Sequence, residues 1–561
     1  RTMRGIDYMS ASSKKKLRKE QNAAQLTEKQ LREKKEAKKL KNYTVTFVIV
    51  MVLVVCLGIG MIGGTAFINS GILERNTDAV KIGDRVLTNA QLNYYYVDAI
   101  NNTYNEWYQE YGDYMSLMAL MSNKINLSMP LNEQAHPTDE GRTYADFFVD
   151  MAIAEARRAY ALNDLAAAKG ITLSEDDLTD IDDLISSQEM LAPLYGYNNL
   201  KGYLKGMYGN GATEESYREY LTVTKLASNF QNKYRDELAY TADDLKDYND
   251  KHYDEFSSFS FTYFFMEAED FLEHAEGDNA HNHTDADKAA ALKKAEEAAK
   301  KLAESGAKTV EEFEAAIKKV EGWQDEKTLK ATDNNFVMYS EINENIAKWL
   351  ADKSRKAGDL AMIPYTTTST DGDGKETTTT SGYFVVLFEE VDTNDAFLVD
   401  IRHILVEFKG GTKNDAGETV YSDTEKKTAL DKITEIQNTW LEGDANEESF
   451  KQLAIKETDD SGSASAGGLY EDVYPHQMVE NFDNWCFDAA RKAGDYGIVE
   501  TEYGYHLIYF VKTGDTTYRN QMIEDTLRKN DYTKWYEALP ETISAEVLNT
   551  SRLDLDLVMA G

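Results

Sequence analysis

The amino-acid sequence predicts an α+β protein in which a transmembrane helix precedes a mainly helical domain and two related domains that contain strands. Three observations carry this prediction. Residues 44–68 contain no ionisable side chain. Apolar residues recur at helical spacing between residues 89 and 255. Residues 256–395 and 396–515 each begin and end on segments that alternate with period two, which is typical of strands with one buried face.

The N-terminal segment predicts a membrane anchor. Residues 1–42 carry 14 Lys and Arg against 5 Asp and Glu and form a basic tail. The apolar stretch 44–68 is long enough to cross the ~30 Å hydrocarbon core of a lipid bilayer as a helix, and it is longer than the apolar part of a cleaved signal peptide. Because a positive flank stays in the cytoplasm, we expect a single-pass protein of the cell membrane, spanning it through residues 43–69. Its N-terminus would be cytoplasmic and the bulk of the chain extracytoplasmic.

Charge and cysteine content exclude other classes of function. The formal net charge is −37 over 561 residues, in spite of the basic tail. A chain this acidic does not favour nucleic acid as a partner, and its self-repulsion favours a monomer, although a homodimer stays open. Only two cysteines occur, Cys56 within the apolar stretch and Cys486 far from it, so no disulfide framework is expected.

Two features resemble metal sites without meeting the requirements of one. His274, His281 and His283 lie in a polar, acidic stretch with no cysteine and no fixed ligand spacing, which favours a solvated linker. Residues 371–374 read Asp-Gly-Asp-Gly, the start of a calcium loop, but no acid follows at the required distance. We therefore expect no metal and no cofactor.

The block from residue 76 to residue 255 predicts a helical domain. Residues 78–88 alternate around a Gly-Asp pair and predict a short hairpin, after which Thr88 or Asn89 caps a helix. Further helices are expected over 144–169, from Ser174, from Thr213 and over 240–256, and a last helical run over 518–548. The many tyrosines, among them Tyr94–Tyr96, favour core packing; the alternative is a groove for extended apolar segments of unfolded chains.

An internal repeat relates the two strand-containing domains. Trp349 and the segment Arg355-Lys-Ala-Gly-Asp lie 136 residues before Trp485 and the segment Arg491-Lys-Ala-Gly-Asp. The first domain has Tyr263 and Phe384 at the positions where the second has His403 and His506, and it lacks a double glycine. A single repetition at this period predicts two copies of one domain rather than a solenoid, the first copy without catalytic chemistry.

The second copy resembles a known enzyme family. It opens on a strand-like segment with His403, closes on a strand-like segment with His506, and holds Gly467-Gly468 and the apolar pair Met478/Phe482 between them. This arrangement is similar to the parvulin family of peptidyl-prolyl cis-trans isomerases, which implies an antiparallel sheet flanked by helices. The hairpin, helical block and two modules together resemble the membrane-anchored foldases of the PrsA and SurA type. That resemblance implies a discontinuous chaperone domain over 76–255 and 516–549, with the C-terminal helix packing back.

The parvulin resemblance implies a set of site residues. His403 and His506 hydrogen-bond in the floor of the site, and Thr501 closes it. Asp460 faces the peptide bond, with Asp459 as the competing assignment; its place beside an apolar pocket predicts a raised pKa. The residues expected to line the proline pocket are Leu469, Met478 and Phe482. Many family members read Gly-Gly-Asp-Leu-Gly where this chain reads Gly467-Gly468-Leu469-Tyr470, so the register of Leu469 is open.

The chemistry implied by the resemblance requires no nucleophile and no cofactor. Rotation about an X-Pro bond crosses a barrier of ~18–20 kcal/mol, through a twisted amide that has lost its resonance. An apolar slot for the proline ring and a few polar groups suited to the twisted form lower that barrier. We therefore expect an extracytoplasmic foldase that isomerises X-Pro bonds in unfolded or partly folded secreted or surface polypeptides.

Two other functions remain open from the sequence. A holdase chaperone would use both parvulin-like domains for peptide binding without catalysis. A structural surface protein would neither isomerise X-Pro bonds nor suppress the aggregation of a denatured client.

Overall fold

The computed structural model describes residues 70–555, except 123–124, 126–128, 138–140, 273–282, 321–328, 371–374 and 415–416. The basic tail, the expected membrane span 43–69, His274, His281 and the Asp-Gly-Asp-Gly segment therefore lie outside the described residues. Within the described residues, no helix combines the length and the apolar character needed to cross a membrane.

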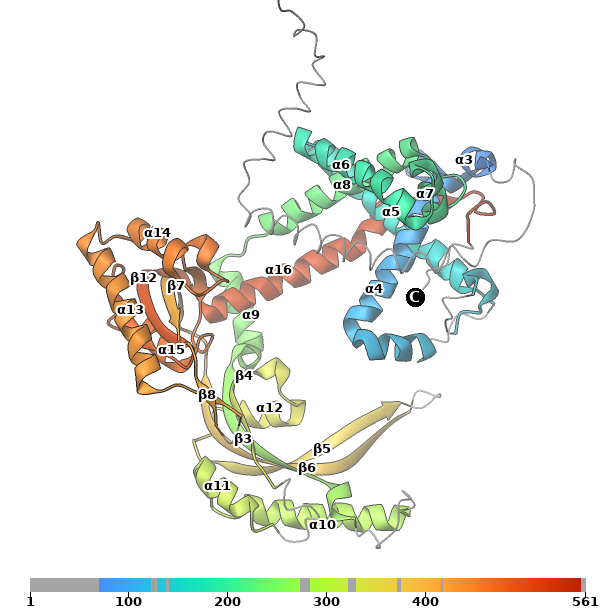
Figure 1. The fold of residues 1–561 in the computed structure, drawn as a ribbon. Coiled ribbons are helices and arrows are strands. Elements are labelled where there is room, and N and C mark those ends of the chain that lie inside the picture. The colour runs from blue at the N-terminus through green and yellow to red at the C-terminus, as the bar shows by residue number, and fades with distance from the viewer. Residues whose placement is uncertain are drawn as a thin grey trace, which may run out of the picture. The chain divides into compact units, whose positions relative to one another are not determined.

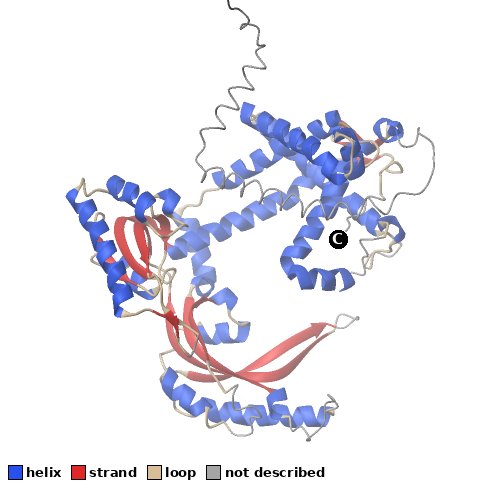
Figure 2. Cartoon of the chain, in the orientation of Figure 1, coloured by secondary structure: helices blue, strands red, loops and turns tan. Residues whose placement is uncertain are grey.

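The chain forms two compact units. Among the described residues, unit 1 comprises those up to Leu238 and those from Asn530 on, and unit 2 comprises those between Ala239 and Lys529. The division falls at residues 238 and 530, whereas the sequence placed it near 255 and 516. Helices and antiparallel sheets occur together, as the predicted α+β class requires (Figure 2).

Unit 1 is a helical block with a small sheet (Figure 1). Its longer helices are α4 (Asn89–Ser122), α5 (Tyr144–Ala168), α6 (Glu175–Leu191), α7 (Leu200–Tyr208) and α8 (Glu214–Glu237), with the short α3 (Ile72–Asn76) before them. The predicted hairpin is β1 (Asp78–Ile82) and β2 (Arg85–Thr88), and β13 (Ala545–Val547) pairs with β1 on its other side. The C-terminal segment thus completes a sheet that the N-terminal segment begins.

Capping residues set the helix starts in unit 1. The Thr143 and Ser174 side chains accept hydrogen bonds from the backbone N–H groups of Asp146 and Asp177, whose carboxylates bond back to the cap residues. Such reciprocal capping satisfies two N–H groups that a helix start otherwise leaves free.

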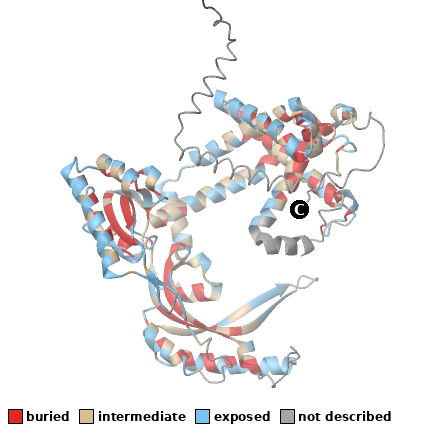
Figure 3. Ribbon diagram, in the orientation of Figure 1, coloured by how far each residue is buried: buried red, intermediate tan, exposed pale blue. Residues whose placement is uncertain are grey.

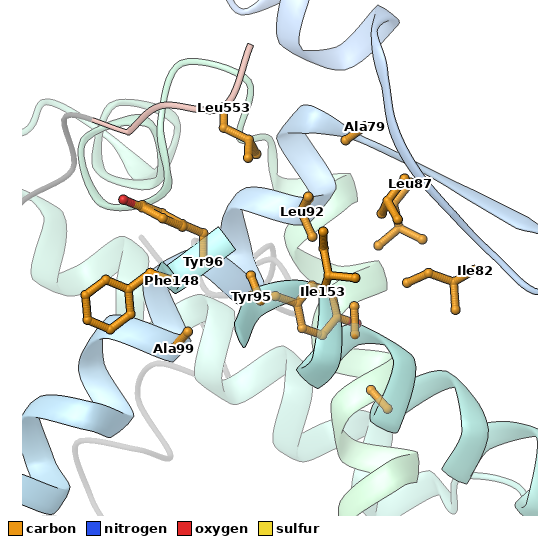
Figure 4. Close-up of a cluster of buried hydrophobic side chains, with 14 of the residues drawn as sticks. Ala79, Ile82, Leu87, Leu92, Tyr95, Tyr96, Ala99, Phe148, Ile153 and Leu553 are labelled. Atoms are coloured by element: carbon orange, nitrogen blue, oxygen red, sulfur yellow. The ribbon is translucent and has the colours of Figure 1, made fainter. Parts of the chain in front are cut away.

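The core of unit 1 lies between α4, α5 and the hairpin (Figure 4). Tyr94, Tyr95 and Tyr96 are 0–4% exposed. These three tyrosines are therefore core residues, as the sequence favoured, although Tyr95 also lines a small pocket with Asp98 and Tyr220.

Unit 2 contains two four-stranded antiparallel sheets, one in each copy of the repeat. In the first copy the strand order is β4-β3-β6-β5, formed by β3 (Ser258–Glu267), β4 (Thr332–Met338), β5 (Leu360–Thr370) and β6 (Glu376–Asp392). Its helices are α10 (Asp285–Ala303) and α11 (Val310–Ile317) on one face and α12 (Glu344–Leu350) on the other. Helix α9 (Ala242–His252) precedes it.

The second copy repeats this arrangement. Its strand order is β10-β7-β12-β11, formed by β7 (Phe397–Glu407), β10 (Leu469–Val473), β11 (Tyr496–Glu500) and β12 (Gly504–Thr517). Helices α13 (Asp423–Glu442) and α14 (Glu447–Glu457) cover one face and α15 (Glu480–Cys486) the other. The central strand β7 is buried along most of its length, and β12 is buried over its first half (Figure 3).

The motif that revealed the repeat has a structural role in both copies. The Arg355 guanidinium lies 4.1 Å from the Trp349 ring, and Arg491 lies 3.8 Å from the Trp485 ring. Each arginine also donates its Nε–H to the carbonyl of the same tryptophan, at 3.2 and 3.0 Å. The motif therefore ends a helix with a cation–π contact and carries no catalytic chemistry.

A buried arginine joins the segments that border the first copy. Arg519 is the second residue of α16 (Tyr518–Ala538) and is 2% exposed. Its guanidinium donates to the Thr393 carbonyl, to the Tyr253 carbonyl and to the Ser257 hydroxyl at 2.6–2.8 Å. These bonds hold the start of α16 within unit 2.

Candidate active site

The two central strands of the second copy bring His403 and His506 together. In the register of β7 and β12, His403 lies opposite Ile508 and His506 opposite Leu405. The two side chains therefore project diagonally from the same face, and their Nδ1 atoms are 3.1 Å apart. Both histidines are buried, with 4% and 6% of their surface exposed.

Loop residues extend this pair into a chain of four side chains. His403 Nε2 lies 2.9 Å from Asp460 Oδ2, and His506 Nε2 lies 2.9 Å from Thr501 Oγ1. Thr501 Oγ1 accepts a hydrogen bond from the Tyr503 N–H, and its hydroxyl has two acceptors in reach, His506 Nε2 at 2.9 Å and the Gly504 carbonyl at 3.4 Å, of which His506 is the nearer. With both rings neutral, each then donates through one nitrogen and accepts through the other, so every partner is satisfied.

The Asp460 carboxylate accepts several hydrogen bonds that hold it in place. It accepts from His403, from the Tyr470 hydroxyl at 3.1 Å, from the Gly462 N–H at 3.1 Å, and from both the hydroxyl and the N–H of Ser463. The hydrogen bond from His403, followed by those from Ser463 and Gly462, lowers the pKa of Asp460 below its ordinary value although burial opposes this. The expectation of a raised pKa is wrong, because the donors outweigh the apolar surroundings.

Asp459 faces a different part of the structure. Its carboxylate accepts from the Glu407 N–H at 3.1 Å and lies 3.3 Å from Lys409 Nζ. Of the two competing assignments, the structure places Asp460 beside His403.

Burial keeps His506 neutral. Desolvation, followed by the neighbouring His403, lowers the pKa of His506 from 6.5 to about 3. At neutral pH the ring therefore carries one proton and can act both as donor and as acceptor.

An aromatic wall lies against the histidine pair. The Phe482 ring packs edge-on against His403 and His506, at centroid distances of 5.5 and 5.2 Å. Met478 is partly buried in the same cluster, which also holds Ile401 and Ile508. Met478 and Phe482 thus lie on the histidine side of the sheet.

Leu469 does not share this cluster. It pairs with Arg402 at the start of β10, and the next residue, Tyr470, turns towards the histidines. The Tyr470 ring lies 5.2 Å from the His403 ring, and its hydroxyl bonds to Asp460. Because side chains alternate along a strand, the register that the sequence left open places Tyr470 in the position expected for Leu469.

Two further residues of the site were missed from the sequence. Ser463 bonds to His403 Nε2 at 3.2 Å and to Asp460, and Tyr470 bonds to Asp460. Ser463 is one of several serines in a Ser/Gly/Ala segment, so nothing marked it before the loop was folded. Tyr470 could have been found, because a tyrosine directly follows the Gly-Gly-Leu motif in the sequence.

The double glycine positions the loop that carries Asp460. Gly467 and Gly468 both have positive φ, at 69° and 72°. The Gly468 carbonyl accepts the His403 N–H at 2.8 Å, and a Cβ on Gly468 would lie 2.1 Å from the His403 carbonyl oxygen. Arg402 holds the same turn by donating to the carbonyls of Ala466 and Gly467. Only glycine allows the loop to approach β7 so closely.

The first copy has the same scaffold with different side chains. Tyr263 lies opposite Val386 in its sheet, as His403 lies opposite Ile508 in the second. The Tyr263 and Phe384 rings pack edge-on at 5.5 Å, where the second copy has its histidine pair. Within the described residues, no group of three His, Cys, Asp or Glu side chains is placed to hold a metal ion.

Comparisons with known proteins point to one family. Residues 403–512 match the Rotamase family model, described as a PPIC-type PPIase domain. The chain is 37% identical over 67 residues to Foldase protein PrsA 1 of Listeria monocytogenes, covering 12% of this chain and 23% of that protein. It is 29% identical over 154 residues to Foldase protein PrsA of Staphylococcus epidermidis, covering 26% of this chain and 44% of that protein.

The matched region is less than half of the length of these curated relatives. Among solved structures, PrsA from Bacillus subtilis aligns with 76% of this chain and 98% of its own, at 14% identity and a TM-score of 0.25. A score this low does not bear on function.

Proposed function

Residues 403–512 form a parvulin-type (PPIC-type) peptidyl-prolyl isomerase domain, and from this premise we propose that the chain is a membrane-anchored foldase. It accelerates cis-trans isomerisation of X-Pro bonds in unfolded or partly folded secreted polypeptides. Residues 44–68 anchor it in the membrane with the N-terminus in the cytoplasm, and the helical block of unit 1 binds unfolded chains.

One observation carries the catalytic part of this proposal. The chain Asp460–His403–His506–Thr501 is hydrogen-bonded throughout and lies against the Phe482 ring. An X-Pro bond placed between this polar chain and the aromatic wall loses water, which destabilises its planar, strongly dipolar form relative to the twisted one. Polar groups that are fixed beforehand need no reorganisation as the amide rotates. We assign Met478 and Phe482 to the proline ring, with Tyr470 beside them.

The proposed extracytoplasmic location and the proposed clients are supported by the relatives and by the N-terminal sequence. The relatives are named foldases, and the sequence places a basic flank before an apolar stretch of membrane-spanning length.

The test is proline-isomer exchange in a short X-Pro peptide, measured with the full chain. The wild-type protein should accelerate exchange, and the double variant His403→Ala/Asp460→Ala should lower kcat/KM by about 10²-fold, as expected for removing preorganised polar groups. Asp459→Ala is the matched control, because that carboxylate bonds to Glu407 and Lys409 instead, and it should retain activity.

The holdase alternative gives a different result in the same experiment. A holdase would suppress the aggregation of a denatured client without accelerating isomer exchange. A wild-type protein that fails to accelerate exchange, or a double variant as active as the wild type, would contradict the enzymatic proposal.

A further inference from the structure

His476 lies in the segment that leads into the aromatic wall of the second copy. Its backbone has φ +67°, which is uncommon for a residue other than glycine. Its N–H donates to Asp483 Oδ1 at 3.0 Å, and Met478 follows two residues later. The conformation of this residue therefore influences the direction in which the segment 477–483 continues.

Two residues of the first copy hold the His476 side chain. The Phe336 ring stacks on the imidazole at a centroid distance of 3.3 Å and an interplanar angle of 6°. Asp392 Oδ2 lies 3.0 Å from His476 Nε2. The imidazole is thus fixed in both plane and direction by residues of β4 and of the end of β6.

Phe336 is itself held in an unusual backbone conformation. Its φ is +50°, and its N–H donates to the Ser260 hydroxyl of β3 at 3.1 Å. The β3–β4 pairing is irregular next to this point, between Phe259 and Phe261. A non-glycine residue in the left-handed region persists where the surroundings compensate for it, and such positions often have a function.

A short series of contacts leads from His476 to the histidine pair. Asp483, which accepts the His476 N–H, is 7% exposed and lies in α15 beside Phe482. Phe482 packs edge-on against both His403 and His506. A shift of His476 would therefore move the Phe482 ring relative to the two histidines that it packs against.

We propose that Phe336 and Asp392 of the first copy are positioning residues for the isomerase site of the second copy, acting through His476 on the wall formed by Met478 and Phe482. This inference rests on the proposed isomerase function. It gives the first copy, which has no histidine pair, a role in the reaction of its neighbour. The contact supplies an aromatic face and a carboxylate to an imidazole. The Phe336 ring belongs to neither hydrophobic cluster that the described residues of the first copy form, whereas Asp392 also accepts the Asn394 N–H through Oδ1 at 2.7 Å, so Phe336 is the more selective probe of the two.

The test compares full-length variants in the X-Pro exchange assay. Phe336→Ala and Asp392→Ala should each lower kcat/KM about tenfold, since small displacements of a positioned wall are enough for such losses. Phe336→Tyr keeps a flat ring for the stack and should restore activity to within about twofold of the wild type. If Phe336→Ala acted only by destabilising the first copy, there would be no reason for a flat ring at position 336 to restore the activity.

Phe265→Ala is the matched control. Phe265 is an aromatic residue of the same sheet that packs on Tyr365 and Phe384 and has no contact with His476 among those the structure describes. Its truncation removes as much aromatic surface from the first copy and should leave kcat/KM unchanged. Hydrogen exchange supplies a second readout: Phe336→Ala should accelerate exchange over residues 474–483, and Phe265→Ala should not.

The outcomes separate this inference from the function on which it rests. An active wild-type protein whose Phe336→Ala and Asp392→Ala variants keep full activity would overturn the positioning role alone. A loss of activity in Phe265→Ala equal to that in Phe336→Ala would overturn it as well. A wild-type protein without isomerase activity would overturn the proposed function and this inference together.

Discussion

Each histidine of the candidate site is satisfied by one residue of the sheet and one residue of a loop. His403 bonds to His506 and to Asp460, and His506 bonds to His403 and to Thr501. A buried ring nitrogen without a partner would destabilise the fold by about 1–3 kcal/mol. The strand positions of His403 and His506 can therefore hold a histidine pair only where loop residues supply the remaining hydrogen-bond partners.

The burial of His506 predicts acid sensitivity of the second copy. Its pKa falls from 6.5 in the unfolded chain to about 3 in the folded domain. Between these values the unfolded chain binds a proton that the folded domain does not, so the free energy of unfolding should decrease as the pH falls. The loss is at most about 1.4 kcal/mol per pH unit, and it begins near the upper pKa and ends near the lower one.

His506→Phe should remove this contribution, because it introduces the residue type that the first copy carries at Phe384. The measurement is the urea concentration at which β12 loses its hydrogen-exchange protection, at about pH 5 and about pH 7. An equal shift of this midpoint with pH in the variant and in the wild type would contradict the assignment to His506.

Strand periodicity predicted that His403 and His506 each lie in a strand, and the parvulin resemblance predicted that the two side chains meet, which their 3.1 Å Nδ1–Nδ1 distance confirms. Periodicity was not enough for Tyr470 and Ser463, because the register of their loop depends on two successive glycines of positive φ. The pKa of Asp460 was expected in the wrong direction for a related reason. Its donors come from four other residues, His403, Gly462, Ser463 and Tyr470, and the sequence predicted none of these hydrogen bonds.

At the scale of elements, the close approach of the Gly467-Gly468 turn to β7 determines where Asp460 lies. Gly468→Ala would place a Cβ 2.1 Å from the His403 carbonyl oxygen. We expect it to destabilise the second copy by about 1–3 kcal/mol and to reduce isomerase activity, because the loop must move away from His403. Thermal unfolding and the X-Pro exchange assay measure the two effects.

Gly494→Ala separates backbone strain from steric clash. Gly494 also has positive φ, at +90°, but the nearest atom to an added Cβ is the Tyr509 hydroxyl oxygen at 3.9 Å. This variant should be destabilised by the strain alone and should keep its isomerase activity. If both variants lose activity equally, the contact with His403 is not the cause.

At the scale of the whole molecule, the C-terminal segment belongs to the unit that the N-terminal segment begins. Strand β13 pairs with β1, and the Trp535 ring stacks on Tyr234 at 3.7 Å. The resemblance to foldases predicted this return of the chain, but periodicity did not predict its form. Residues 539–555 leave the helix and form a short strand, whereas a helix was expected to residue 548.

Deletion of residues 530–561 should therefore weaken unit 1 selectively. It removes one strand of a three-stranded sheet and the partner of an aromatic stack, so residues 70–238 should become more sensitive to limited proteolysis. Isomerase activity should persist. Val547→Ala keeps the backbone pairing of β13 and should resist proteolysis as the wild type does; equal resistance of the deletion variant would refute the expectation.

The arginine at the start of α16 has a consequence for the order in which the chain matures. Arg519 follows its partners Thr393, Tyr253 and Ser257 by 126, 266 and 262 residues in the sequence. During vectorial synthesis those partners emerge long before the guanidinium that joins them. The hydrogen bonds that join these segments through Arg519 can therefore form only after the whole second copy has been synthesised.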